Sequence, residues 1–279
     1  MGLGQRKYVS MERNQFISFR ETTIFYRIYG SGKTVVLIHG FGEDGNIWNY
    51  LSNKLQNNFS VIIPDLPGSG KSELLKDKEQ ILIDDYAEVI VHILKKESLN
   101  KCTAIGHSMG GYVVLAIADK FPEILNGFGL FNSTAYADTE KKKRDRLKSI
   151  EFMKKNEGAS FLKTSIPGLF AEKFKQDHAH EIEAFIDSVK YFSSEALIQY
   201  YYAMINRPER INVLQTTTLP VLFIIGEKDP AVPLEKALAQ SHLPAIAYVH
   251  ILTDAGHIGM LEEKELCTEI ISSYLNAIE

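Results

Sequence analysis

The residue with the most specific chemical context in this sequence is a serine in a glycine-rich segment. Ser108 is the centre of Gly106-His107-Ser108-Met109-Gly110-Gly111, a Gly-x-Ser-x-Gly pattern that follows the apolar run Cys102 to Ile105. A helical pattern begins directly afterwards at Tyr112, so the segment predicts a strand, a sharp turn and a helix, with the serine exposed on the turn. Glycines are expected two residues before and after the serine because such a turn crowds their Cβ positions. Ser108 is therefore a candidate nucleophile.

A serine hydroxyl needs a base that takes its proton and an acid that orients the base. The chain order expected for this kind of scaffold is serine, then Asp or Glu, then histidine. Asp229 follows the apolar run Val221 to Ile225, and His257 follows a run that ends near Leu252. Taken alone, each of the two residues has a non-catalytic explanation. An Asp before Pro often forms a turn, and His257 is one of 8 histidines in the chain. Their order and positions together indicate a catalytic triad with Ser108.

Attack on a carbonyl places negative charge on its oxygen, and this charge requires preorganised N–H donors. The expected donors are the backbone N–H groups of Met109, after the nucleophile, and of Phe41, in the loop that follows an earlier strand. Two further histidines are interpreted as structural. His107 is adjacent to the serine, and adjacent residues on a sharp turn diverge, while His39 is expected to brace its loop through hydrogen bonds.

Two other glycine-rich segments match nucleotide-binding motifs, and physical arguments disfavour both. Gly40 to Gly45 reads Gly-x-Gly-x-x-Gly after an apolar run, and Asp65 follows at about the spacing of the ribose-binding acid in dinucleotide-binding loops. Glu43 and Asp44, however, would place two carboxylates where a pyrophosphate binds. Gly68 to Ser72 resembles the end of a P-loop, but an aspartate occupies the position of the first glycine. A nicotinamide-dependent oxidoreductase is kept as an alternative.

The elements that must position these residues alternate between short apolar runs and helical spacing, which is typical of a parallel sheet buried on both faces. Glu21-Thr22-Thr23 separates the first two runs and predicts a hairpin. Helical spacing is clear from Tyr86 and again from Leu266. We therefore predict an α/β fold in which helices cover both faces of a mostly parallel, eight-stranded sheet. The expected strands are Phe16 to Phe19, Ile24 to Tyr29, Val35 to Ile38, Val61 to Ile63, Thr103 to Ile105, Phe128 to Phe131, Val221 to Ile225 and Ala247 to Ile251.

One long stretch interrupts this alternation. Residues 135–212 show helical patterns, many Phe and Tyr residues and no convincing strand. We expect a core domain of residues 1–134 and 213–279, with residues 135–212 inserted as an all-helical cap. The basic run Lys141 to Arg144 has acidic neighbours and is interpreted as a solvated helix face. The aromatic residues of the cap, including Tyr200 to Tyr202, are expected to shape an apolar pocket.

Composition excludes several classes of protein. The 279 residues are 45% hydrophobic and 24% charged, which excludes disordered and fibrous classes. Lys+Arg 31 against Asp+Glu 35 gives a net charge of −4, which provides no electrostatic surface for nucleic acid or an anionic membrane. A small molecule is therefore the expected partner. The histidines are dispersed without ligand spacing, so no metal or organic cofactor is expected.

The expected location is the cytoplasm. The N-terminal segment Met1 to Phe16 lacks the apolar stretch of a signal peptide or anchor, and no run reaches the length of a membrane span. The two cysteines, Cys102 and Cys267, lie in apolar periodic segments and are expected to be buried, reduced thiols.

These motifs resemble those of the α/β-hydrolase family, and in particular its capped serine hydrolases. The resemblance implies that Ser108 is the nucleophile, His257 the base and Asp229 the acid. Some relatives carry the acid after the sixth strand, but this chain has Asn132-Ser133 there, so Asp229 remains the choice. The matching segments follow the family order from about residue 16 to 278 and are His39 to Gly42, Asp65 to Ser72, Gly106 to Gly111, Gly226 to Pro233 and Gly256-His257.

The resemblance implies hydrolysis of a carboxylic ester, thioester or lactone of a small acyl substrate through an acyl-enzyme. Haloalkane dehalogenases and epoxide hydrolases use Asp where this chain has Ser108, which argues against both. Carbon–carbon bond hydrolases share the serine, although many have an aromatic residue where this chain has Ile258. Such a hydrolase, an aminopeptidase-like member and a ligand receptor with negligible turnover are kept as alternatives.

Overall fold

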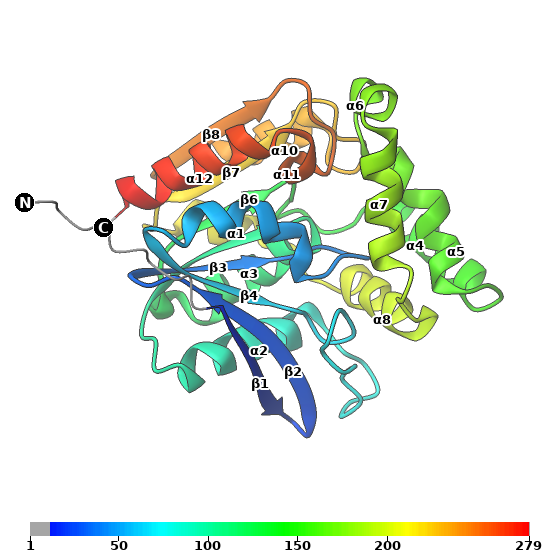
Figure 1. The fold of residues 1–279 in the computed structure, drawn as a ribbon, viewed down its shortest axis with the longest axis horizontal. Helices are drawn as coiled ribbons and strands as arrows, with labels where there is room; N and C mark the ends of the chain where they lie inside the picture. Colours follow the sequence, from blue (N-terminus) through cyan, green and yellow to red (C-terminus); the bar gives the residue numbers. More distant parts are fainter. Residues whose placement is uncertain (1–11, 279) are drawn as a thin grey trace, which may run out of the picture.

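An eight-stranded sheet forms the centre of the computed structural model, which describes residues 12–278 (Figure 1). The strand order is β1-β2-β4-β3-β5-β6-β7-β8, in which β2 pairs antiparallel with β1 and β4 while all other neighbours are parallel. The predicted hairpin and mostly parallel sheet are confirmed. Residues 1–11, which hold most of the segment interpreted as lacking a signal peptide, lie outside the described residues. The strands are β1 Arg13–Phe19, β2 Thr22–Tyr29, β3 Lys33–Ile38, β4 Phe59–Pro64, β5 Cys102–His107, β6 Leu125–Phe131, β7 Val221–Gly226 and β8 Ala247–Leu252.

Helices cover both faces of this sheet. On one face α1 (Asn49–Leu55) packs against α12 (Lys264–Ala277), and on the other α2 (Ile83–Lys96) packs against α3 (Met109–Lys120). Strands covered on both faces need apolar residues at every position, which explains their continuous apolar runs. The shorter elements of this part are η1 Gly45–Trp48, η2 Pro122–Ile124, α10 Leu234–Ser241 and α11 Gly259–Glu262.

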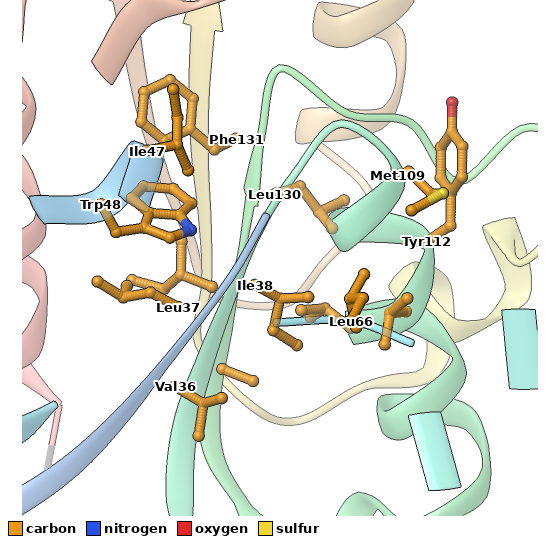
Figure 2. Close-up of a cluster of buried hydrophobic side chains, with 14 of the residues drawn as sticks. Val36, Leu37, Ile38, Ile47, Trp48, Leu66, Met109, Tyr112, Leu130 and Phe131 are labelled. Atoms are coloured by element: carbon orange, nitrogen blue, oxygen red, sulfur yellow. The ribbon is translucent and has the colours of Figure 1, made fainter. Parts of the chain in front are cut away.

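The central strand β3 shows how successive residues fill the two layers of the core. Leu37 and Ile38 are fully buried, and their side chains point to opposite faces of the sheet, as the two-residue period of a strand requires. Figure 2 shows Leu37 on the side of Trp48 and Ile38 on the side of Leu66. Trp48 in turn packs against Phe131 of β6, with ring centroids 6.0 Å apart. The end of β3 is therefore held firmly where the next loop begins.

Two interpretations of apolar segments are wrong. The run Ala247 to Ile251 forms β8, but this strand is at the edge of the sheet, and Val249 and Ile251 are 41% and 42% exposed rather than buried. In α12, Leu266 is 41% exposed, and the neighbouring Cys267 faces the core instead. Apolar spacing alone does not decide which of two adjacent apolar residues a helix buries, nor whether a strand is central or at an edge.

The chain between β6 and β7 forms helices and, within the described residues, no strand. In Figure 1 the helices labelled α4 to α8 lie together to one side of the sheet. The predicted boundary at residue 212 falls inside the last of them, and Arg210, just before it, pairs with Asp84 of α2 and Asp119 of α3. The division into core and cap at residues 135 and 212 stays a prediction. The helices are α4 Glu140–Met153, α5 Gly158–Ser165, η3 Ile166–Leu169, α6 Glu172–Asp177, α7 Ala179–Val189, α8 Ser194–Ile205 and α9 Ile211–Thr216.

Candidate active site

Ser108 occupies the sharp turn between β5 and α3, which confirms the predicted strand, turn and helix. Its backbone has φ +50° and ψ −114°, a conformation that is strained for a residue with a side chain. The backbone N–H of Ser108 donates to the carbonyl of Phe131 at 2.9 Å, which ties the turn to β6. A Cβ on Gly106 would lie 2.2 Å from the backbone of Gly110, so the crowding expected at these glycines is present.

The structure brings Ser108 together with His257 and Asp229. His257 Nε2 lies 2.9 Å from Ser108 Oγ, and His257 Nδ1 lies 2.8 Å from Asp229 Oδ2. Asp229 Oδ1 accepts the N–H groups of Ala231 at 2.7 Å and Val232 at 2.9 Å, so the turn after β7 fixes the carboxylate. Because Nδ1 faces a carboxylate, it carries the proton, and Nε2 is left as an acceptor for the serine hydroxyl. His257 and Asp229 are both buried, which strengthens their interaction.

The loop that follows β3 lies directly against Ser108. A Cβ on Gly40 would be 3.1 Å from the Cβ of Ser108, and Gly42 has φ +67°, so glycines allow this loop to turn back over the serine. Phe41 lies between them. Within residues 12–278, the backbone N–H groups of Phe41 and Met109 have no hydrogen-bond acceptor. Both predicted donors are free to bind a ligand, and their role as an oxyanion hole stays a prediction.

A buried ion pair connects this loop to His257. Glu43 accepts the N–H of Gly40 at 2.7 Å, and its carboxylate lies 2.9 Å from His107 Nδ1. His107 Nε2 lies 2.8 Å from the backbone carbonyl of His257. Because both ring nitrogens face acceptors, the ring is a protonated double donor. Burial opposes both charges, but their mutual attraction raises the pKa of His107 and lowers the pKa of Glu43. In the sequence Glu43 stands out only as a carboxylate unfavourable for phosphate, and no pattern predicts its part in the site.

Asn132 is a second residue of the site for which the sequence predicts no role. Its side-chain amide donates to the carbonyls of Gly256 at 2.8 Å and His257 at 2.7 Å, and its oxygen accepts the N–H of Gly226 at 2.7 Å. These bonds link the ends of β6 and β7 to the turn that carries His257. The signal that points to Asn132 is a polar residue directly after a buried strand, at the edge of the sheet where ligands bind in such folds.

His39 is buried and braces its loop, as predicted. Its Nε2 accepts the N–H of Leu66 at 2.9 Å and lies 2.8 Å from Ser69 Oγ. Nδ1 therefore carries a proton, and it lies 2.8 Å from the carbonyl of Gly40. These bonds fix the start of the loop that passes over Ser108.

In the two segments that match nucleotide-binding motifs, several backbone N–H groups already donate to side chains of the protein. In Gly40 to Gly45, two N–H groups donate to the carboxylates of Glu43 and Asp65. In Gly68 to Ser72, two N–H groups donate to Asp65 and to the hydroxyl of Tyr191. A phosphate would have to displace buried carboxylates from these positions, which is unfavourable. This geometry argues against both nucleotide-binding alternatives.

Aromatic side chains of the helical insertion cover Phe41. Tyr201 of α8 stacks on Phe41 with ring centroids 4.4 Å apart and an interplanar angle of 4°, and Phe161 of α5 meets it edge-on at 6.3 Å. The neighbouring tyrosines differ from Tyr201. Tyr200 is fully buried and donates to a backbone carbonyl of the core, whereas Tyr202 is 37% exposed. That this stretch shapes a substrate pocket stays a prediction.

Both cysteines are buried and free, as predicted. Burial raises the pKa of the Cys102 thiol to about 12, so this thiol is inert. In the part of the chain that the structure describes, no group of three or more His, Cys, Asp or Glu side chains is arranged to hold a metal ion. No helix among residues 12–278 has the length and hydropathy needed to cross a membrane. The expectations of no metal, no cofactor and a cytoplasmic location stay predictions.

Replacing Glu43 with alanine should lower kcat by about tenfold to a hundredfold and leave KM little changed. The change removes the acceptor for Gly40 and the partner of His107, which loosens both the loop over Ser108 and the carbonyl of His257, and small displacements of this kind cost rate. Steady-state kinetics on a p-nitrophenyl ester measures the effect. Glu43→Gln keeps both hydrogen bonds and should restore most of the rate, while the exposed Glu79→Ala serves as the control. Equal rates for Glu43→Ala and wild type would contradict a positioning role.

The same ion pair predicts a characteristic dependence of stability on pH. A lowered carboxyl pKa contributes stability above its ordinary value of 4.5, and this is lost as pH falls through the folded value. A raised histidine pKa contributes stability below 6.5, and this is lost as pH rises through the folded value. The excess unfolding free energy of wild type over Glu43→Gln should therefore be largest between pH 4.5 and 6.5 and shrink on either side. Urea unfolding at a series of pH values measures it, and a difference independent of pH would show that the pair is not ionised.

A model of the alpha/beta hydrolase family matches residues 35–269 of the chain. The chain belongs to the alpha/beta hydrolase family. The match includes the loop after β3, the turn at Ser108 and the two later segments with Asp229 and His257, so the resemblance inferred from the motifs is confirmed.

Individual relatives support the same family. This alpha/beta hydrolase is 30% identical over 219 residues to the pimeloyl-[acyl-carrier protein] methyl ester esterase of Wigglesworthia glossinidia brevipalpis, covering 76% of this chain and 81% of the relative. It is similar in structure to a malate-bound thermophilic esterase from Thermogutta terrifontis, with a TM-score of 0.87, 26% identity and coverage of 96% and 98% of the two chains. An uncharacterized protein of Mycobacterium tuberculosis is 37% identical over 101 residues, which are 36% of this chain but span only 29% of that protein's length.

Proposed function

We propose that this alpha/beta hydrolase is a serine hydrolase that cleaves the carboxylic ester of a small acyl substrate. The observation that carries the proposal is the unbroken hydrogen-bonded chain from Ser108 Oγ through the His257 imidazole to the Asp229 carboxylate. Two relatives that bear the name esterase support the choice of bond. A thioester or lactone contains the same acyl carbonyl and is compatible with the same chemistry.

The geometry supports a two-step reaction. His257 Nε2 takes the proton of Ser108 Oγ as that oxygen attacks the acyl carbon, and the N–H groups of Phe41 and Met109 receive the negative charge that forms on the carbonyl oxygen. The imidazolium then gives the proton to the leaving alcohol, which leaves an acyl group on Ser108. In the second step, His257 takes a proton from water as the water oxygen attacks the acyl carbon. The imidazolium then returns that proton to Ser108 Oγ as the bond to the acyl carbon breaks and the acid is released. Asp229 stays ionised throughout and stabilises the imidazolium.

Labelling with a fluorophosphonate tests the nucleophile. We expect one phosphonyl group per chain, located by peptide mass spectrometry on the peptide that contains Ser108, because the probe needs a hydroxyl activated by a neighbouring base. The absence of labelling, or a label on another residue, would overturn the proposal. Hydrolysis of p-nitrophenyl esters of rising chain length then separates an esterase from a receptor, which would be labelled without sustained turnover. A rise in Tm with NAD(H) or NADP(H) would instead favour the oxidoreductase alternative.

A further inference from the structure

A cluster of basic residues lies where α4 of the insertion approaches the core. Arg146 donates through Nε to Asp138 at 2.6 Å, and Arg207 Nη1 lies 3.0 Å from the other oxygen of the same carboxylate. Lys142, on the same helix as Arg146, donates to the backbone carbonyl of Ala231 at 3.1 Å. Within the basic run Lys141 to Arg144, which is predicted to form a solvated helix face, Lys141 and Arg144 are exposed, whereas Lys142 is half-buried.

The charges in this cluster do not balance. Within residues 12–278, Asp138 is the carboxylate that pairs with Arg146 and Arg207, and Lys142 pairs with none. Three positive charges therefore lie around one carboxylate, with Asp138 and Arg207 buried and Arg146 and Lys142 half-buried. Uncompensated charge is costly to bury, so a further anion would be favourable here.

The unused hydrogen-bond donors of the cluster belong to Arg146 and Tyr112. The terminal nitrogens of Arg207 donate to the carbonyls of Met204 and Tyr136, at 2.7 and 2.9 Å. By contrast, Arg146 donates through Nε to Asp138, and within residues 12–278 neither its terminal nitrogens nor the hydroxyl of Tyr112 is hydrogen-bonded to another protein group. Burial opposes ionisation of Tyr112, but the positive charges of Arg207, Lys142 and Arg146 hold the pKa of its phenol below the ordinary value.

This cluster lies next to the candidate active site. Tyr112 is four residues after Ser108, one turn along α3, and Figure 2 shows its hydroxyl directed away from the buried cluster around Ile38 and Leu66. On the other side, the Arg146 guanidinium lies over the ring of Tyr201 at 5.2 Å, and that ring stacks on Phe41. Tyr112 is therefore one helical turn from Ser108. The Arg146 guanidinium is separated from Phe41, in the loop after β3, by the ring of Tyr201.

We propose that Arg146 and Tyr112 bind an anionic group, a carboxylate or a phosphate, carried by the substrate at a distance from the ester that Ser108 attacks. The proposal rests on the proposed function and narrows its substrate class to esters with a second, negatively charged end. Asp138 orients the guanidinium of Arg146 through Nε, which leaves its two terminal nitrogens as a fork for the anion. Lys142 and Arg207 add positive charge around this fork. Among the described residues, Arg207 pairs with Asp138 and Lys142 pairs with no carboxylate.

Paired substrates of nearly equal shape test the proposal. The monomethyl esters of glutaric and adipic acid carry a free carboxylate, and the same esters with a terminal carboxamide are their neutral partners. The ratio of kcat/KM for the charged over the neutral ester should be about tenfold or more in wild type, since a charge-assisted hydrogen bond is worth that much. Arg146→Gln should bring the ratio close to one, and Tyr112→Phe should lower it by a few-fold. A ratio that is near one in wild type, or that Arg146→Gln leaves unchanged, would overturn the proposal.

Arg144→Gln is the matched control, because Arg144 lies on the same helix but is exposed. It should keep the wild-type ratio. If Arg146→Gln does not fold, inhibition of wild type by glutarate against glutaramide gives the same comparison, and equal inhibition by the two would contradict the site. Stronger competitive inhibition by inorganic phosphate than by glutarate would identify a phosphate as the preferred group. Failure of the proposed function gives a different result, namely no hydrolysis of either ester and no fluorophosphonate label.

Discussion

Replacing Ser108 with alanine should lower kcat by about 10⁴-fold to 10⁶-fold and abolish fluorophosphonate labelling. The only atom lost is Oγ, which lies 2.9 Å from His257 Nε2 and is the sole group of the site placed to form an acyl intermediate within the described residues. Residual hydrolysis above the uncatalysed rate would come from the N–H groups of Phe41 and Met109 and from substrate binding. The measurement is steady-state turnover of a p-nitrophenyl ester, with the labelling reaction followed by intact mass.

A double variant separates this effect from general damage to the protein. Residues that act as a unit are not additive, so Ser108→Ala combined with His257→Ala should be about as slow as Ser108→Ala alone. Multiplied losses in the double variant would show that the two residues act independently, which the proposed mechanism does not allow. Ser133→Ala is a suitable control for loss of a nearby hydroxyl, because Ser133 Oγ donates to the backbone carbonyl of Ser108 and does not contact His257.

Replacing Asp229 with asparagine should lower kcat by about 10⁴-fold while the protein stays folded. The asparagine oxygen can still accept the N–H groups of Ala231 and Val232, so the turn keeps its bonds. Its NH2 group then faces His257 Nδ1, which becomes an acceptor, and the proton moves to Nε2, where it blocks transfer from Ser108. Steady-state kinetics and Tm measured on the same sample check both parts of this expectation.

Asp254→Asn provides the control for loss of a carboxylate close to His257 in the sequence. Asp254 is exposed and pairs at 3.4 Å with Lys173, so its replacement should leave the rate near that of wild type. A small loss of rate in Asp229→Asn would mean that another acid orients the imidazole. Asn132 occupies the alternative position for the acid, and it presents its amide nitrogen to the carbonyl of His257, so the structure offers no carboxylate there.

The sequence predicts the parts of this fold that depend on local patterns. Apolar runs place all eight strands, and the glycines around Ser108 predict the turn, because both signals come from residues adjacent in the chain. The errors concern position within the whole molecule. Val249 and Ile251 have the composition of a central strand but lie at an edge, and Leu266 has the correct period but faces solvent. Neither is decided by local spacing.

The candidate site is predictable to a similar degree. Ser108, Asp229 and His257 follow from motif and chain order, and the structure brings them into hydrogen-bond contact. Glu43 and Asn132 do not follow, because their partners are 64 and 125 residues away and only folding brings them together. The positions of Arg146 and Arg207 are also out of reach, since the sequence alone does not show which basic residues turn inward to share the carboxylate of Asp138.

The backbone of Ser108 has a further consequence. A residue with a side chain held at φ +50° and ψ −114° raises the energy of the folded state, and only the bonds around it, such as the one to Phe131, keep it there. The candidate nucleophile is thus also a weak point of the native state. This turn therefore lowers the thermal resistance of the fold, and in exchange it keeps the Ser108 hydroxyl within hydrogen-bond distance of His257.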